Sequence, residues 1–363
     1  MLTSTNSAFA SPAQEPTTGV ESFITGAVEP HRNEFNMWKK TLNSHQMLLE
    51  DAKKRRKTES QQIGGTYLFS RRGRLIGGLD SGMTTLVSRQ AKHACSSMQL
   101  TKQYLLASDV PQPTGHTFHS TQLSAAGEYV HGQGAAVLVK PATSQARPTI
   151  SREVASSTDF TAAWKRAVDA VAKLPAVEQQ INVEVYVPGM SLRVCTVGEE
   201  AVAALVRVPL YVVGNGDSTL EELTNAEKEL RSPCSYLTAH FPTNNELFGE
   251  NSVFASTDVP KASSIVLLTE SADIKLAGNI TVDVFDAVSN DLLSLAVDAM
   301  WAFPGLQATA VDIRTPTLQN ADTAAVTRVE PAADFTEFIY PTLGQPRRVG
   351  VRMIDQMTKV SSL

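Results

Sequence analysis

The sequence has 363 residues, of which 42% are hydrophobic and 19% are charged, an ordinary globular balance. This composition excludes a wholly disordered or fibrous chain, and the length indicates about two or three domains. The 32 Lys and Arg residues against 37 Asp and Glu residues give a formal net charge of −5, which argues against binding nucleic acid through bulk positive charge.

The cysteines and the hydropathy pattern bear on the compartment. Cys95, Cys195 and Cys234 are far apart, which excludes a disulfide framework and a CxxC zinc site. No apolar run approaches the ~18 residues that a membrane span needs. Residues 1–20 form a polar tail rich in Ser, Thr and Pro, without the charged start and apolar centre of a secretory signal. We therefore expect a soluble protein of the cytoplasm, a reducing compartment.

Apolar side chains at roughly helical spacing predict a helical segment over residues 21–57. They are Phe35, Trp38, Leu42, Met47 and Leu48. The basic run Lys-Lys-Arg-Arg-Lys at 53–57 ends this segment. A solvated helix end is the favoured interpretation, because cations stabilise a helix C-terminus. A basic docking site is the alternative.

Short elements follow this segment. The sequence GGTYLFSRRGRLIGG predicts a hairpin whose turn contains Arg71, Arg72 and Gly73. Two short helices are expected at 84–95 and 97–107. The prolines that come next forbid helix and favour extended backbone.

Strands and helices alternate from residue 135 onward. Strands are predicted at 135–140, 182–187, 192–197, 201–209, 308–313 and 325–330, and helices at 158–174 and 292–303. The strands at 192–197 and 201–209 should pair as a hairpin across Gly198-Glu199-Glu200. The predicted fold class is α+β, with antiparallel sheets backed by helices.

Several charged residues stand on or beside these predicted strands. Lys140 ends an apolar strand, where it is either exposed or a phosphate ligand. Glu184 lies on an alternating strand, where an acid usually faces solvent. Arg193 and Arg207 lie on the two strands of one hairpin among apolar residues. Burying a guanidinium is costly unless an anion receives it, so both an internal ion pair and a ligand anion such as phosphate are open.

Asp312 and Glu330 fall on two late strands that should pair. Two carboxylates brought together repel unless a cation or a base lies between them. Oxygen ligands of this kind suit Mg²⁺. Arg328 shares a strand face with Glu330 and is the alternative source of neutralising charge.

Seven segments in a fixed order span about residues 84 to 350. They read SMQLTKQYLLASDVPQPTG, AAVLVKP, INVEVYVPGMSLRV, VRVPLYVVGNGDSTLEEL, AGNITVDVFD, ATAVDIRTP and VEPAADFTEFIYPTLGQPRRV. In this order the chain resembles the ATP-grasp ligases, and most of all the branch that contains cyanophycin synthetase and bifunctional glutathione synthetase.

The resemblance implies an ATP-grasp fold, in which two α+β lobes with antiparallel sheets clamp a nucleotide. A short N-terminal helical and β region precedes the two lobes in the sequence. We expect the polar tail at 1–20, an N-terminal region at 21–95 that helps to bind substrate in related ligases, a small lobe at 96–182 and a large lobe at 183–363. The implied reaction is attack of a carboxylate on ATP to give an acyl-phosphate, which an amine captures as an amide. The implied partners are an amino acid or short peptide and an amine, with no nucleic acid and no membrane, and the implied assembly is a homo-oligomer.

The resemblance also implies roles for individual residues. Lys140 and Arg147 would contact the ATP phosphates, Glu184, Tyr186 and Val187 would form the adenine hinge, and Ser191 stands where the family places an acid near the ribose. Arg193 and Arg207 would stabilise the transferring phosphoryl group. Asp312 and Glu330 would hold Mg²⁺ between the β- and γ-phosphates.

The chain departs from the family pattern in the small lobe. Ser97 and Met98 replace the usual Asp-Lys, so one phosphate-binding lysine is absent, and Lys102, one helical turn later, is placed to substitute in part. The loop ATSQARPT keeps Arg147 but lacks the glycines that let backbone amides approach phosphates, and Pro148 removes a donor.

Further departures lie near the end of the chain. Arg328-Val329-Glu330 replaces Glu-Val-Asn, so an arginine occupies a metal-ligand position. Ala333-Asp334 replaces Pro-Gly, and Phe338 replaces a histidine. These changes leave two explanations besides a resemblance of fold alone: a divergent ligase, or a non-catalytic ATP-grasp paralogue that binds a nucleotide or acts as a scaffold. The retained lysine, arginines and acids favour the ligase.

Overall fold

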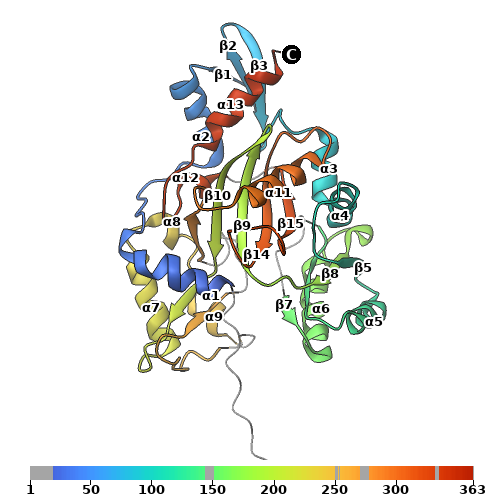
Figure 1. Cartoon of the computed structure of the whole chain (residues 1–363), viewed down its shortest axis with the longest axis vertical. Helices are drawn as coiled ribbons and strands as arrows, with labels where there is room; N and C mark the ends of the chain where they lie inside the picture. Colours follow the sequence, from blue (N-terminus) through green and yellow to red (C-terminus); the bar gives the residue numbers. More distant parts are fainter. Residues whose placement is uncertain are drawn as a thin grey trace, which may run out of the picture.

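The computed structural model describes residues 19–143, 151–249, 252, 254–269, 278–331 and 335–362. In these parts of the chain the strands form four sheets, and every strand pair in them is antiparallel. Helices pack against the sheets (Figure 1). The predicted α+β class is therefore confirmed.

The central sheet has five strands (Figure 1). Their order is β13 (Ile280–Asp283), β10 (Glu200–Val208), β9 (Met190–Val197), β14 (Ala308–Thr315) and β15 (Ala325–Glu330). The hairpin of β9 and β10 and the pairing of β14 with β15 were both predicted and are confirmed.

Alternating residues of the central sheet contribute to two separate cores. Leu192 and Val206 belong to the core that α11 (Asn290–Trp301) covers, and Ser289 caps this helix by accepting from Leu292 N. Cys195 and Leu205 point to the opposite face and pack with α13 (Val349–Val360). The period-two alternation thus buries both faces of one sheet.

The small lobe is built on a four-stranded sheet at the lower right of Figure 1. Its order is β5 (Gly115–His119), β8 (Gln180–Val185), β6 (Val137–Pro141) and β7 (Ser151–Val154). Helices α5 (Leu123–Gln133) and α6 (Ser157–Val171) pack on this sheet, and the short η4 (Ala176–Glu178) follows α6. Helices α3 (Arg89–Ser96) and α4 (Met98–Ala107) instead bury apolar side chains in the core of the central sheet. Because β8 pairs along its length with β5 and β6, the small-lobe sheet continues to Val185, three residues beyond the boundary expected at 182.

The N-terminal part is not one helix, contrary to the prediction for 21–57. It contains α1 (Gly19–Phe23), η1 (Ile24–Val28), η2 (Glu29–Glu34), α2 (Ser44–Glu50) and η3 (Asp51–Arg55). The residues between η2 and α2 are non-helical because tertiary hydrogen bonds hold them: Asn36 Nδ2 and Trp38 Nε1 donate to Pro341 O at 3.1 and 2.9 Å. Asn43 then caps α2 with a capping box.

A four-stranded sheet lies at the top of the molecule in Figure 1. It consists of β1 (Glu59–Ile63), β2 (Thr66–Arg71), β3 (Arg74–Asp80) and β4 (Met83–Thr84). The predicted hairpin is confirmed, and its turn residues Arg72 and Gly73 have φ of 52° and 74°, the left-handed pair that a tight two-residue turn requires. The helix expected at 84–95 begins only at Arg89, because Ser88 caps it.

The remaining elements complete the large lobe. They are β11 (Tyr211–Val213), β12 (Ile265–Leu267), α7 (Leu220–Arg231), α8 (Ser235–Thr238), α9 (Asn244–Phe248) and α12 (Thr336–Ile339). None of the helices in the described parts is long and apolar enough to cross a membrane. All three cysteines carry free thiols, as the sequence predicts.

Candidate functional site

Strand register places charged side chains on one face of the central sheet. Arg193 on β9 lies opposite Asp312 on β14, which lies opposite Arg328 on β15. Residues directly opposite each other on neighbouring strands share a face, and so do residues two apart on one strand. Glu330 and Arg207 therefore belong to the same face, since Leu205 is the partner of Arg193 on β10. The order of the strands thus gathers side chains that are far apart in the sequence.

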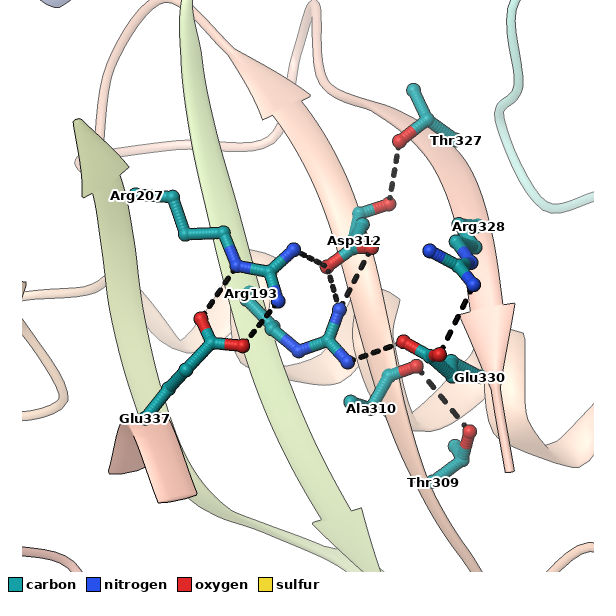
Figure 2. A network of polar contacts seen from close by, with 9 residues as sticks. All are labelled: Arg193, Arg207, Thr309, Ala310, Asp312, Thr327, Arg328, Glu330 and Glu337. Carbon is teal, nitrogen blue, oxygen red and sulfur yellow. Dashed lines mark hydrogen bonds and ion pairs between the residues drawn. The ribbon is translucent and has the colours of Figure 1, made fainter. Parts of the chain in front are cut away.

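These side chains form one ion-pair network (Figure 2). Arg193 Nη1 donates to Asp312 Oδ1 and Oδ2 at 2.7 and 2.9 Å, and Arg193 Nη2 donates to Glu330 Oε2 at 2.5 Å. Arg207 Nε donates to Glu337 Oε2 at 2.6 Å, its Nη2 donates to Oε1 of the same group, and its Nη1 lies 3.7 Å from Asp312 Oδ1. Arg328 Nη2 donates to Glu330 Oε1 at 3.0 Å. The network joins three guanidinium groups to three carboxylates.

Arg193 and Asp312 are buried, which strengthens the electrostatic attraction between them. The side chain of Arg193 is only 1% exposed and that of Asp312 is 10% exposed. Burial alone would raise the pKa of Asp312, but the attraction of Arg193, Arg207 and Arg328 outweighs it and holds the pKa below its ordinary value. For Arg193, burial opposes the charge, while Asp312 and Glu330 more than compensate, so its pKa lies well above the ordinary value. Both groups are charged at neutral pH.

A second charged cluster lies in the small lobe, around Glu184 on β8. Lys140 Nζ on β6 donates to Glu184 Oε1 at 2.6 Å, and Lys102 Nζ on α4 lies 3.0 Å from Glu184 Oε2. Asn182 Nδ2 also donates to Glu184 Oε2, at 2.8 Å, and Lys102 Nζ donates to the Pro113 carbonyl at 2.6 Å. Two ammonium groups thus face one carboxylate, and the cluster keeps a net positive charge.

The electrostatics of this cluster follow from its burial. Burial alone would raise the pKa of Glu184, but Lys140 and Lys102 lower it to about 2. Burial lowers the pKa of Lys102, and the attraction of Glu184 opposes that shift only in part. Two partly buried lysines with one shared carboxylate form a local surplus of positive charge, which suits an anion.

No model of a protein family matches the chain. It is 28% identical over 278 residues to cyanophycin synthetase from Trichormus variabilis, covering 73% of this chain and 29% of that protein. It is 25% identical over 264 residues to the glutathione biosynthesis bifunctional protein GshAB from Enterococcus faecalis, covering 69% of this chain and 33% of that protein. The chain thus spans about a third of the length of these curated relatives.

A solved structure agrees with these sequence relatives. The structure of a bifunctional glutathione synthetase from Pasteurella multocida superposes with a TM-score of 0.58 at 20% identity, covering 87% of this chain and 44% of that one. This chain is a divergent relative of the ATP-grasp ligases.

The structure brings most of the predicted site residues into the two clusters. Arg193, Arg207, Asp312 and Glu330 meet in the large lobe. Lys140 and Glu184 meet in the small lobe, joined by Lys102. Arg147, Ala333 and Asp334 lie outside the described residues.

The predicted hinge lies between the two sheets. Tyr186 and Val187 follow β8, and Arg314 at the end of β14 reaches both: its Nε donates to Val187 O at 3.3 Å and its Nη2 to Tyr186 Oη at 3.4 Å. The Arg314 guanidinium also lies 5.9 Å from the centre of the Tyr186 ring. Ser191 lies on β9, two residues before Arg193, and is half-buried.

Glu337 is the site residue that the sequence analysis missed. It lies on α12 and its side chain is 3% exposed, so its carboxylate is the buried partner of Arg207. The signal was indirect: an arginine on an apolar strand requires an anion, but nothing in the sequence near Glu337 shows which acid supplies it. Lys102 was noted as a substitute lysine, and its ammonium group does reach the carboxylate that Lys140 contacts.

The carboxylates can be compared with the needs of Mg²⁺. Asp312 and Glu330 lie on adjacent strands and Arg193 bridges them, which provides the intervening cation expected from the sequence. No group of three His, Cys, Asp or Glu side chains able to hold a metal occurs among the described residues. One or two carboxylates together with substrate phosphates are the usual Mg²⁺ site. The arrangement therefore fits one ion shared with phosphates, and does not form a cage made by the protein alone.

Proposed function

We propose that this chain is an ATP-dependent carboxylate–amine ligase, which forms an amide bond on an amino acid or small peptide through an acyl-phosphate. The observation that supports it most directly is the set of buried arginines and acids on one face of the central sheet. Curated relatives named cyanophycin synthetase and glutathione biosynthesis bifunctional protein point the same way. The chain spans about a third of those proteins, so the proposal concerns the part that it shares with them.

In this proposal the large lobe stabilises the charge that develops during phosphoryl transfer. Arg193 and Arg207 present planar forks that match phosphate and carboxylate oxygens. Acids on neighbouring elements fix where both guanidinium groups lie before a ligand enters. Asp312 and Glu330 would hold Mg²⁺, which shields the triphosphate when it is bound.

The small lobe would bind the rest of the nucleotide. Lys140 and Lys102 would contact phosphate oxygens with the positive charge that Glu184 leaves uncompensated. Tyr186 and Val187 would flank the adenine, with Arg314 holding the hinge in position. We also propose the substrate-binding role for the region at 21–95. Homo-oligomeric assembly and a cytoplasmic location stay predictions.

The second candidate function is a non-catalytic nucleotide-binding or scaffolding paralogue. One observation favours it: the guanidinium groups of the large-lobe network already have carboxylate partners, and Arg328 pairs with Glu330 at 3.0 Å. A protein that only binds a nucleotide or acts as a scaffold has no need to exchange these carboxylates for phosphate. The ligase remains the better account, because burying Arg193 and Arg207 on sheet positions is costly and a scaffold can do without it.

A two-substrate assay tests the ligase. The protein is incubated with ATP, Mg²⁺ and pooled amino acids, and inorganic phosphate is measured with each pool left out in turn. A ligase releases phosphate only when both an acid and an amine are present. Nucleotide binding without any release, in every pool, would favour the paralogue.

The variant Asp312→Asn then separates the two candidates. It keeps the size of the side chain and removes the negative charge that pairs with Arg193. A ligase variant should lose turnover while the protein stays folded, as judged by circular dichroism. Asp291→Asn, an exposed position at the start of α11, is the matched control and should keep full turnover.

A further inference from the structure

A basic segment stands out at the end of the molecule away from the proposed nucleotide site. Residues 51–75 contain eight Lys or Arg side chains and two Asp or Glu side chains, a net charge of +6 in a chain whose total is −5. The rest of the chain therefore carries −11. Figure 1 shows β1 and β2, which belong to this segment, at the opposite end from the small lobe. The charge asymmetry is large enough to attract an anionic partner.

The β1–β2 register gathers this charge in one place. Glu59 on β1 lies opposite Ser70 on β2. Lys57, two residues before Glu59, is therefore beside the hairpin turn that contains Arg71 and Arg72. Chain connectivity brings Lys53 on η3 to the same end of β1. We call Lys53, Lys57, Arg71 and Arg72 the basic rim.

Within the described parts of the chain, the side chains of the basic rim have no ion-pair partner. Neighbouring basic residues have such partners: Lys54 pairs with Glu50 at 2.8 Å, and Arg56 pairs with Asp355 at 2.6 Å. Among the described residues, the four side chains of the basic rim have no carboxylate within ion-pair distance. Three of the four are exposed and Arg71 is partly exposed. Their charge is therefore available to a ligand.

Beside the basic rim lies an open sheet edge. β1 is the outer strand of its sheet, and all five of its residues are exposed. The outer side of β1 has no strand partner in the described parts of the chain. An unpaired edge offers a row of N–H and C=O groups to another extended chain. Ile63 at its far end is 55% exposed and adds an apolar contact.

We infer that the β1 edge and the basic rim together dock an extended acidic peptide, which adds as a fifth strand. The open edge favours a peptide over nucleic acid or a membrane, because only a peptide backbone completes its hydrogen bonds. The basic rim favours acidic side chains, and a second copy of this edge, whose strand ESQQI carries one acid, supplies few of them. The docking surface does not depend on the proposed nucleotide site.

Fluorescence anisotropy with defined peptides tests this inference on the full chain. The probe is a labelled peptide of about eight residues, the length of an ordinary strand, in which Glu and Thr alternate. There are two comparison peptides. In one, Gln replaces every Glu, which removes the charge. In the other, Pro replaces every Thr, which keeps the charge but prevents strand pairing. We expect the Glu-Thr peptide to bind, and to bind more weakly as salt is added.

Charge variants locate the site. Lys57→Gln with Arg72→Gln should weaken binding of the Glu-Thr peptide roughly fourfold, as expected for two exposed ion pairs. Lys165→Gln with Lys173→Gln, which removes two exposed charges from the small lobe, is the matched control and should leave binding unchanged. Circular dichroism checks that both variants are folded.

Several outcomes would overturn the inference. Equal binding of the proline peptide would show that the charge acts without strand pairing. Tighter binding of a single-stranded oligonucleotide or of phosphatidylserine vesicles would assign the surface to another partner. Absence of peptide binding at low salt would show that the basic rim only guards the edge against aggregation. Loss of binding in the Lys165 and Lys173 variant would place the peptide elsewhere.

Discussion

Replacing Glu184 by Gln tests the charge arrangement of the small lobe. In the protein, one buried carboxylate balances two ammonium groups, those of Lys140 and Lys102. The substitution keeps the shape of the side chain and removes its charge. It therefore leaves two partly buried lysines without a counter-ion, which is costly.

The size of the effect follows from the pKa. The two lysines lower the pKa of Glu184 from an ordinary 4.5 to about 2. Each unit corresponds to about 1.4 kcal/mol, so the charged carboxylate contributes about 3 kcal/mol to the free energy of unfolding at neutral pH. A carboxyl group with a lowered pKa in the folded state stabilises above its unfolded pKa. This contribution is lost as the pH falls from about 4.5 towards 2.

Guanidinium-chloride unfolding followed by tryptophan fluorescence measures this effect, because Trp164, one of the three tryptophans, is buried in the small-lobe core. At pH 7 the Glu184→Gln variant should be less stable by about 3 kcal/mol. The difference from the wild type should shrink as the pH falls below 4.5. Glu128→Gln, an exposed position on α5, is the control and should match the wild type. A pH-independent difference, or one below about 1 kcal/mol, would refute the assigned charge pairing.

Three further substitutions test the large lobe and the hinge by denaturation and by titration. Glu337→Gln should lower the free energy of unfolding by about 3 kcal/mol, because it leaves Arg207 without its buried partner. A double-mutant cycle with Arg207→Met should show that the two losses do not add. Additive losses would mean that the pair is not coupled. Arg328→Ala should change the free energy of unfolding by less than about 0.5 kcal/mol, because its side chain is 44% exposed. The same variant should tighten Mn²⁺ binding beside an ATP analogue, because it removes one of the two arginines that pair with Glu330 and leaves only Arg193; unchanged affinity in calorimetry would contradict this. Gly189→Ala should lower the free energy of unfolding by about 3 kcal/mol, because φ is 120° and a Cβ there would lie 2.4 Å from the Thr315 carbonyl oxygen. A denaturation midpoint equal to that of the wild type would disprove this strain.

Local patterns predicted most of the architecture. Alternation and β-branched residues placed β9, β10, β14 and β15 correctly, since each strand is buried by its own sequence pattern. The N-terminal segment failed for a physical reason. Phe35 and Trp38 have helical spacing, but both pack against the core, and Trp38 Nε1 donates to the distant Pro341 carbonyl. Such tertiary contacts override local periodicity.

Which residues form the two charged clusters could be predicted from the sequence more readily than how they pair. Arg193 and Asp312 could be named from their strands, because burial of a guanidinium demands an anion. Which anion each arginine takes depends on the register and on the position of α12, and neither is encoded locally. Glu337 was missed for this reason. Lys140 and Glu184 were expected to act on a nucleotide separately, whereas the structure pairs them.

The network of Figure 2 has equal numbers of guanidinium groups and carboxylates, and this bears on how a ligand could enter. A triphosphate offers new acceptors to Arg193 and Arg207, and an arginine that turns to phosphate releases a carboxylate. Asp312 and Glu330, once released, are then oxygen ligands for a divalent cation. If only the nucleotide binds, the released carboxylates lack a partner, and if only the cation binds, the arginines do. Nucleotide binding and cation binding should therefore be coupled, each favouring the other. In the paralogue, with no such exchange, the two ligands would bind independently.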